Sequence, residues 1–154
     1  MMRKIKFRQA MYNGKGEFRH FEYWGESEHG GFAGITSGGR TTIRLALENS
    51  EQYTGLKDKN GREIYEGDIV KWDDRSDGRY WRVCEVKWEP SHYLLEGYWY
   101  KSDKPEVKTP VRFKFGAFIY ENDGELEVIG NIHQSPELLS KDAKDGSSDH
   151  KHNQ

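Results

Sequence analysis

The chain has 154 residues, enough for one domain or two very small ones. Its 24 basic and 26 acidic residues give a formal net charge of −2, which excludes nucleic-acid binding driven by overall charge. No apolar run approaches the roughly 18 residues of a membrane helix, and Cys84 has no second cysteine for an intrachain disulfide. We therefore expect a soluble, cytoplasmic protein with no membrane contact.

Aromatic residues are frequent in a chain with few other apolar residues. They make up 14% of the sequence, although only 34% of all residues are hydrophobic. The interior of a small β-barrel is small, and a few large rings can fill it. Short alternating segments separated by many turns are typical of barrels and sandwiches. The composition and pattern therefore predict a mainly β protein.

The N-terminal residues 4–24 predict a β-hairpin. Ile5–Arg8 alternates apolar and basic side chains, Asn13–Gly16 is a turn, and Phe18–Trp24 has the pattern of a second strand. Glycines interrupt any regular pattern from Gly25 to Gly39, and we expect a loop there.

The central stretch Gln52–Val70 contains the strongest turn signal of the chain. Asn60 and Gly61 both tolerate the positive φ that a tight reversal requires. We expect Asp58 to accept a hydrogen bond within this turn. The neighbouring carboxylates have no histidine or ligand spacing that would favour acid–base work, so the sequence favours structural roles for Glu63, Glu66 and Asp68.

The C-terminal part predicts further strands and one short helix. Tyr93–Tyr100 should be followed by a polar linker that extends through Pro110. Ser135 and Pro136 mark a helix start with a capping side chain, and an apolar-poor tail from Ser140 to Gln154 should be disordered. The expected strands of this part are Ile69–Asp73, Tyr80–Glu89, Tyr93–Tyr100, Val111–Phe115 and Leu126–Ile132.

Alternation along the longest strand divides its aromatic residues between two faces. Trp88 shares a face with Cys84 and Val86, so we expect Trp88 and Cys84 in the core. Trp81 points to the opposite face and is expected at a surface or interface. Such rings could contact a partner or stack on bases, or they could fill a second core or an oligomer contact. The candidate interaction surface consists of Arg79, Trp81, Arg82, Trp99 and Lys101.

The histidines and glycines do not indicate catalysis. His20, His29, His92 and His133 show no metal-ligand spacing, and the pair His150 and His152 lies on the predicted tail. The glycine-rich segment lacks the Lys-Ser/Thr of a phosphate-binding loop. We therefore expect no catalytic residue, no cofactor and no metal ion, and a protein that is not an enzyme.

Three segments resemble one known protein family. The run Tyr53–Gly61, followed by Glu63–Val70, is similar to the central motif of the YopX-type phage proteins. Further segments that fit the family are Arg3–Arg8, Glu127–Ile132 and Pro136–Leu139, so that the resemblance covers about residues 3–139. After Arg8, Gln9–Met11 stands where the family tends to have Ala-Trp.

The resemblance implies a phage- or prophage-encoded accessory protein with an SH3-like barrel in its C-terminal half. We expect an N-terminal β region at 1–50, the barrel at 51–139, and the tail at 140–154. We expect a protein-interaction module that binds a protein partner or a second copy of itself. Nucleic acid, bound by exposed aromatics and basic residues, is the alternative partner.

Overall fold

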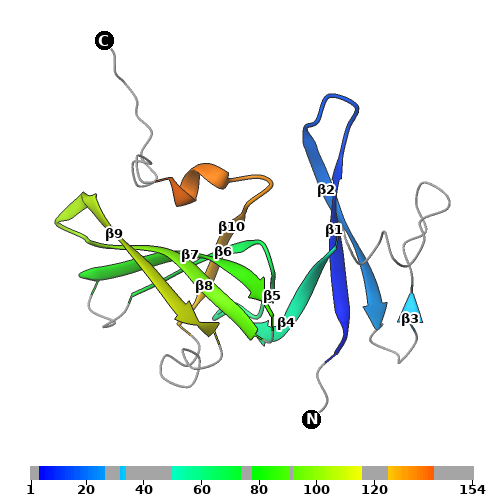
Figure 1. Cartoon of the computed structure of the whole chain (residues 1–154), viewed down its shortest axis with the longest axis horizontal. Helices are drawn as coiled ribbons and strands as arrows, with labels where there is room; N and C mark the ends of the chain where they lie inside the picture. The colour runs from blue at the N-terminus through cyan, green and yellow to red at the C-terminus, as the bar shows by residue number, and fades with distance from the viewer. Residues whose placement is uncertain are drawn as a thin grey trace.

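The computed structural model describes residues 4–26, 32–33, 50–73, 78–90, 92–115 and 125–140, with residues 32–33 described by their backbone alone. These residues form two five-stranded sheets and one short 3-10 helix (Figure 1). The prediction of a mainly β protein is confirmed. Most of the predicted glycine loop and the tail beyond Ser140 lie outside the described residues, as do His29, His150 and His152.

The first sheet contains the predicted N-terminal hairpin. Its strand order is β3-β2-β1-β4-β5. Phe7 stacks on Trp24 across the hairpin with ring centroids 4.2 Å apart, which holds the two strands in register. The strands are β1 (Lys6–Tyr12), β2 (Phe18–Glu26), β3 (Phe32–Ala33), β4 (Glu51–Lys57) and β5 (Glu63–Tyr65).

The second sheet is antiparallel, with the order β10-β6-β7-β8-β9. In Figure 1 it curves beneath the 3-10 helix η1 (Pro136–Leu139). Its strands are β6 (Asp68–Asp73), β7 (Tyr80–Glu89), β8 (His92–Lys101), β9 (Lys104–Lys114) and β10 (Glu127–Asn131).

Strand β4 connects the two regions. At its start Gln52 pairs with Phe7 and Glu51 with Arg8, whereas further along Tyr53 pairs with Tyr65 of β5. Figure 1 shows β4 running from the hairpin toward the second sheet. The domain boundaries at residues 50 and 51 and the SH3-like assignment of the barrel stay predictions.

The turn predicted at Asn60-Gly61 is confirmed. Gly61 has a φ of 81°, and its N–H donates to the Asp58 carbonyl over 3.0 Å. Asp58 Oδ1 accepts hydrogen bonds from the N–H groups of Asn60 and Arg62, both at 2.9 Å. Its other oxygen, Oδ2, accepts the N–H of Val128 at 2.9 Å, so the turn is fastened to β10.

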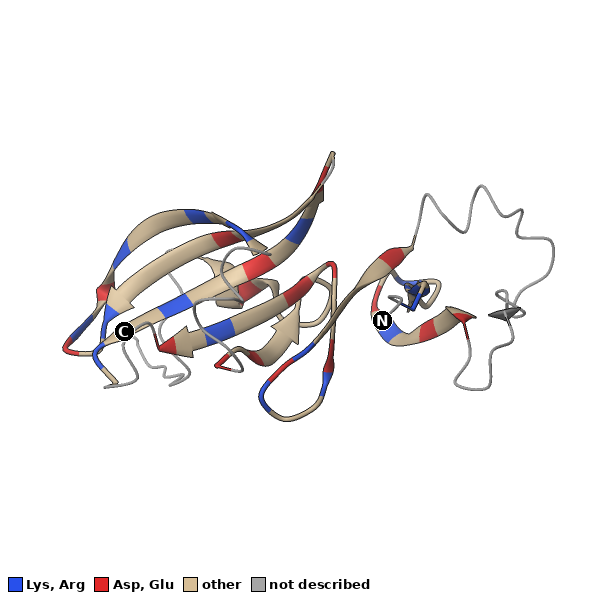
Figure 2. Ribbon diagram, turned by 90° about the horizontal axis from the view of Figure 1, so that it is seen from below, with Lys and Arg blue, Asp and Glu red and all other residues tan. Residues whose placement is uncertain are grey.

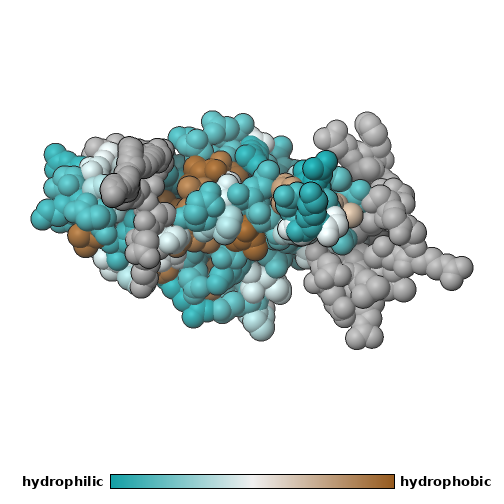
Figure 3. All heavy atoms as spheres, turned by 90° about the horizontal axis from the view of Figure 1, so that it is seen from above, coloured by the Kyte–Doolittle hydropathy of each residue, from teal (hydrophilic) through white to brown (hydrophobic). Residues whose placement is uncertain are grey.

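Both faces of the second sheet are buried in their middle. The first core occupies one face, where Cys84 pairs with Val70 and Val86 with Leu95. The second core, made of Ile69, Val83, Tyr98 and Tyr100, lies on the other face beneath η1. Figure 3 views the molecule from the η1 side and shows hydrophobic atoms at its middle among hydrophilic ones. The first core comprises Ile64, Val70, Trp72, Cys84, Val86, Tyr93, Leu95, Phe115, Leu126 and Val128.

The prediction that Trp88 belongs to the core is wrong, although Cys84 is buried as expected. Trp88 is 49% exposed and contacts the Tyr93 ring, with centroids 4.8 Å apart. It shares the face of Cys84 and Val86, but it stands near the end of β7. Alternation assigns a face and does not say how far along that face the covering elements extend.

The prediction of a polar linker that extends through Pro110 is also wrong, because β9 begins at Lys104 and pairs with β8. Its two prolines, Pro105 and Pro110, obscured the strand in the sequence. Proline lacks the N–H of a ladder hydrogen bond and is tolerated on edge strands. In the described part of the chain β9 is such an edge.

The predicted short helix is present as a 3-10 turn without the expected cap. The Ser135 side chain makes no capping hydrogen bond, and the Ser135 carbonyl accepts the N–H of Leu138 instead. Leu138 also accepts a hydrogen bond through its carbonyl from the Tyr98 hydroxyl at 2.7 Å. The turn is therefore held by its packing on the second core.

Candidate functional site

Four of the five predicted interaction residues gather at one end of the second sheet. Tyr80 pairs with Lys101, and Arg82 pairs with Trp99. Cross-strand partners share a face, and so do alternate residues along a strand. The side chains of Tyr80, Arg82, Trp99 and Lys101 therefore extend the face of the first core beyond its buried part. We call the group Arg79, Tyr80, Arg82, Trp99, Lys101 and Lys104 the aromatic–basic surface.

Two hollows open on the aromatic–basic surface, and Lys101 lines both. The larger has a volume of about 400 Å³ and is lined by Arg79, Tyr80, Lys101, Ser102 and Asp103. The smaller has a volume of about 240 Å³ and is lined by Trp99, Lys101, Lys104, Val107 and Thr109. The exposed Lys101 therefore lies between the two hollows, with Tyr80 lining one and Trp99 lining the other.

The rings of this surface are partly open to solvent. Tyr80 and Trp99 are half-buried, and their centroids lie 6.2 Å apart with planes inclined by 48°. Lys101 Nζ lies 5.8 Å from the centre of the Tyr80 ring, and the Arg82 guanidinium lies 4.7 Å from that of Phe113. A cation over an aromatic face is attracted by the ring quadrupole, which favours these positions of the Lys101 and Arg82 side chains.

Positive charge is concentrated here although the molecule as a whole is slightly acidic. Figure 2 shows basic and acidic residues interspersed along the strands. Among the residues that line the two hollows, Arg79, Lys101 and Lys104 are basic and Asp103 is acidic. Arg82 adds a further cation beside Trp99.

The structure separates Trp81 from the residues with which the sequence grouped it. Trp81 pairs with Tyr100 on the opposite face and packs against the second core. Its Nε1–H donates to the Gly78 carbonyl at 3.1 Å, and Lys71 Nζ lies 4.7 Å from its ring centre. Trp81 is half-buried, which fits the alternative of a second core.

The conspicuous central motif builds a polar junction between the two regions. Arg8 of β1 is 2% exposed, and its guanidinium lies between the rings of Phe21 and Tyr65, 4.0 and 4.9 Å from their centres. Its Nη1 lies 2.9 Å from Asp68 Oδ1, and its Nη2 donates to the Glu66 carbonyl at 3.1 Å. A buried guanidinium needs such partners for its donors.

The junction continues through a carboxylate to a histidine. Arg8 Nε donates to Glu51 Oε1 at 2.9 Å, and Glu51 Oε2 lies 3.0 Å from His133 Nε2. His133 Nδ1 meets the hydroxyl of Tyr12, and the imidazole lies against the rings of Tyr12, Phe18 and Phe21. We call the set Tyr12, Arg8, Glu51, Asp68 and His133 the polar junction.

Burial raises the pKa of two carboxyl groups at the polar junction, those of Asp68 and Glu66. Desolvation raises the pKa of Asp68, although Arg8 and the Tyr65 N–H, 2.8 Å from Asp68 Oδ2, oppose the shift. Desolvation also raises the pKa of Glu66, whose Oε2 accepts the N–H of Gln52 at 3.2 Å. Each of these carboxylates has a backbone partner, as expected for structural roles.

Gly67 completes the junction by leaving room for Glu51. Its φ is 86°, and a Cβ at this position would lie 1.9 Å from Glu51 Oε2. The Gly67 N–H donates to the Val86 carbonyl at 2.7 Å, and its carbonyl accepts the N–H of Ile132 at 2.9 Å. The three consecutive residues Glu66, Gly67 and Asp68 of the central motif thus connect the two sheets.

Metal and thiol chemistry have little support in the described part of the chain. No group of three or more His, Cys, Asp or Glu residues there could hold a metal ion. Cys84 is fully buried, and desolvation raises the pKa of its thiol to about 12, so the group stays protonated. Among these residues, no helix has the length and apolar character needed to cross a membrane.

Comparison with known proteins identifies a partial relative and a protein family. One stretch of 58 residues is 41% identical to the RNA polymerase-associated protein LEO1 of Caenorhabditis elegans, and covers 36% of this chain and 13% of that protein. The profile described as "YopX protein" matches residues 35–140, which include the central motif and the strands β4 to β10. Because this match covers more than half of the 154 residues, the chain belongs to the YopX family.

Proposed function

We propose that this protein is a non-enzymatic binding module that holds a single-stranded nucleic acid on its aromatic–basic surface. The observation that carries the proposal is the pair of half-buried rings, Tyr80 and Trp99, bordered by four basic side chains. We further propose that it is a phage- or prophage-encoded accessory protein with an SH3-like barrel, and that it acts in the cytoplasm of the bacterial host.

Stacking on the two rings would supply affinity without sequence preference. Every base has a flat π face, and one stacked base contributes about 1–3 kcal/mol. The 6.2 Å between the centroids of Tyr80 and Trp99 lets neighbouring bases use one ring each. Arg79, Arg82, Lys101 and Lys104 would contact the phosphates that follow the bases. A net charge of −2 does not oppose such local contacts, because salt screens charges more than about 10 Å away.

A protein partner or a second copy of the chain is the alternative ligand of the same surface. Trp, Tyr and Arg are the residues most enriched in binding hot spots. Val107 lines the smaller hollow and is 59% exposed, and an apolar partner would bury it. Salt dependence separates the two classes, because phosphate contacts release counterions and apolar burial does not.

The test is the anisotropy of labelled oligothymidylate and oligouridylate titrated with wild-type protein at several salt concentrations. We expect saturable binding that weakens steeply with salt. Trp99→Ala should weaken binding about tenfold or more at every salt concentration. Lys101→Gln should lower the salt slope by about one unit. The matched control is Trp88→Ala, which removes an exposed tryptophan from the other end of β7.

Absence of binding at low salt, or equal losses in the Trp99 and Trp88 variants, would contradict the nucleic-acid proposal. Light scattering of the same samples tests the alternative. A wild-type dimer that Trp99→Ala converts into a monomer would identify the surface as a self-association contact.

A further inference from the structure

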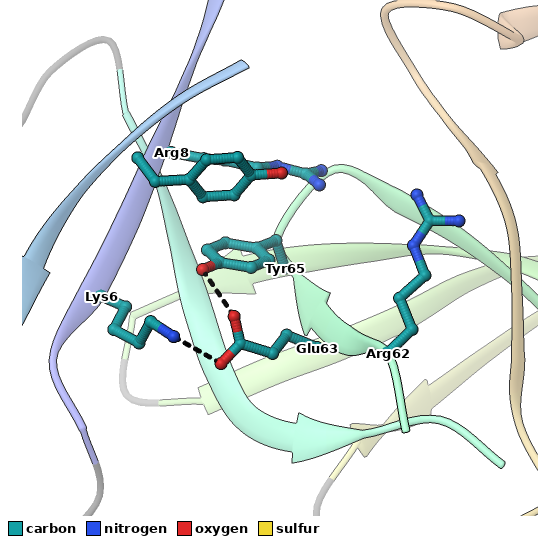
Figure 4. A pocket seen from close by; sticks show the side chains of 6 residues that line it. Lys6, Arg8, Arg62, Glu63 and Tyr65 are labelled. Carbon is teal, nitrogen blue, oxygen red and sulfur yellow. Dashed lines mark hydrogen bonds and ion pairs between the residues drawn. The ribbon is translucent and has the colours of Figure 1, made fainter. Parts of the chain in front are cut away.

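A third hollow lies beside the polar junction, between β1, β2 and β5. It has a volume of about 320 Å³ and is lined by Lys6, Arg8, Tyr23, Arg62, Glu63 and Tyr65, a set that we call the tyrosine pocket. Figure 4 shows Lys6 and Arg62 on opposite sides, with Tyr65 and Glu63 between them. None of these residues belongs to the aromatic–basic surface.

Most charges of the tyrosine pocket already have partners. Lys6 Nζ lies 2.6 Å from Glu63 Oε2, and the Tyr65 hydroxyl donates to Glu63 Oε1 at 3.2 Å (Figure 4). Arg8 is compensated by Glu51 and Asp68 behind the pocket. Among the described lining residues Glu63 is the only acidic one, and its carboxylate is neutralised within the pocket itself.

Arg62 is the remaining basic residue of the pocket, and its positive charge takes part in none of these pairs. Its exposed guanidinium makes no hydrogen bond or ion pair with the residues that the structure describes. Its backbone is fixed by the turn, since the Arg62 N–H donates to Asp58 Oδ1 and the Arg62 carbonyl accepts the Asp58 N–H at 2.8 Å. The fixed backbone of Arg62 thus presents a guanidinium group with five N–H donors to the pocket.

The wall of the pocket is aromatic. Tyr23 is 59% exposed, and its ring meets the Tyr65 ring edge-on with centroids 5.7 Å apart. Tyr65 is buried and Arg8 lies over it, so Tyr23 is the ring that a ligand can cover. A flat group against Tyr23 would bury apolar surface that now faces water.

We propose that the tyrosine pocket binds a small ligand with a flat ring that carries a carboxylate or phosphate group. The anionic group accepts hydrogen bonds from the Arg62 guanidinium, and the ring covers Tyr23. Planar guanidinium groups match both anions with two parallel N–H donors. The site uses residues of β1, β2, β5 and the turn before β5, and none of them belongs to the aromatic–basic surface, so the proposal does not rest on nucleic-acid binding.

The test is a titration of isotope-labelled full-length protein followed by backbone amide NMR signals of residues 62–65. The probes are phenyl phosphate, benzoate and the uncharged benzamide, and the first two distinguish the two anions. We expect saturable binding of at least one anion in roughly the millimolar range, and at least tenfold weaker binding of benzamide.

Two arginine variants, one inside and one outside the pocket, test whether the anion binds at the tyrosine pocket. Arg62→Gln should weaken binding of the anion about tenfold, whereas Arg19→Gln, a change of an exposed arginine on β2 outside the pocket, should have no effect. Trp99→Ala should also leave this affinity unchanged, which keeps the result separate from the nucleic-acid proposal. Equal affinity for benzamide, or equal affinity of wild type and the Arg62 variant, would overturn the proposal.

Discussion

The N-terminal hairpin and the second sheet are held in place by different kinds of interaction. The second sheet buries both faces, with Trp72 and Val86 in one core and Val83 and Tyr98 in the other. The hairpin is attached through the polar junction, where Arg8 is the central group. Apolar packing tolerates many partners of similar size, whereas a buried charge depends on specific ones. The two regions should therefore respond differently to substitution.

The largest effect is expected from removing a ring of the first core. Trp72 is 1% exposed, so Trp72→Ala should lower the free energy of unfolding by about 4–5 kcal/mol through lost apolar contacts and an empty cavity. Urea denaturation measures the loss. Trp88→Ala is the matched control and should cost less than about 1 kcal/mol, because its ring is half exposed. Similar losses in both variants would show that Trp88 is covered in solution.

Loss of the central cation of the polar junction should have the next largest effect. Arg8→Leu leaves the carboxylates of Glu51 and Asp68 buried without their guanidinium, which should cost about 3 kcal/mol. Urea denaturation of Arg8→Leu, of Asp68→Asn and of the double variant measures the coupling. The second change should restore part of the loss, because it removes one uncompensated charge. Additive losses would show that the pair makes no net contribution.

A methyl group at Gly67 should disturb the contact between the regions more than one at Gly61. Both residues have positive φ, but a Cβ at Gly67 would collide with Glu51, whereas one at Gly61 meets no atom within 4 Å. Gly67→Ala should therefore cost about 2–3 kcal/mol, and Gly61→Ala about 1 kcal/mol. Thermal and urea unfolding compare the two. A loss in Gly61→Ala equal to that in Gly67→Ala would argue against the close contact of Glu51.

The smallest effect concerns pH. Burial raises the pKa of Glu66, so the folded state holds this proton more tightly than the unfolded chain does. The carboxyl therefore contributes stability at low pH, and that contribution is lost as the pH rises through the folded pKa. Urea midpoints measured between about pH 4 and 7 should show Glu66→Gln gaining on wild type as the pH rises. A constant difference across this range would contradict the raised pKa.

Local patterns in the sequence predicted the strands better than the contacts between them. The hairpin and the turn at Asn60-Gly61 follow from alternation and from residues that tolerate positive φ, which are properties of a few neighbouring positions. Trp88 was misplaced because alternation gives the face of a strand but not the extent of its cover. The strand at Lys104–Lys114 was missed because its prolines, which an edge accepts, read as a linker.

The polar junction was beyond prediction for a different reason. Arg8 meets Glu51 across 43 positions, and Tyr12 meets His133 across 121. Neither pair has a spacing that marks it in a single sequence. Four of the predicted surface residues, Arg79, Arg82, Trp99 and Lys101, do lie at one end of the sheet. Arg79 directly precedes β7, and the other three belong to β7 and β8, two strands whose pairing follows from their short connection.

Asp58 has a consequence for the order in which the chain folds. Its Oδ1 closes the turn that it begins, while within the described residues its Oδ2 accepts a hydrogen bond from the N–H of Val128 alone, 70 residues later. During synthesis the central motif therefore leaves the ribosome well before its last hydrogen-bond partner. The turn can form at once, but its attachment to the sheet must wait for β10, and closing so long a loop slows folding. A nascent chain that ends before Val128 thus keeps the family's central motif as an incompletely paired hairpin.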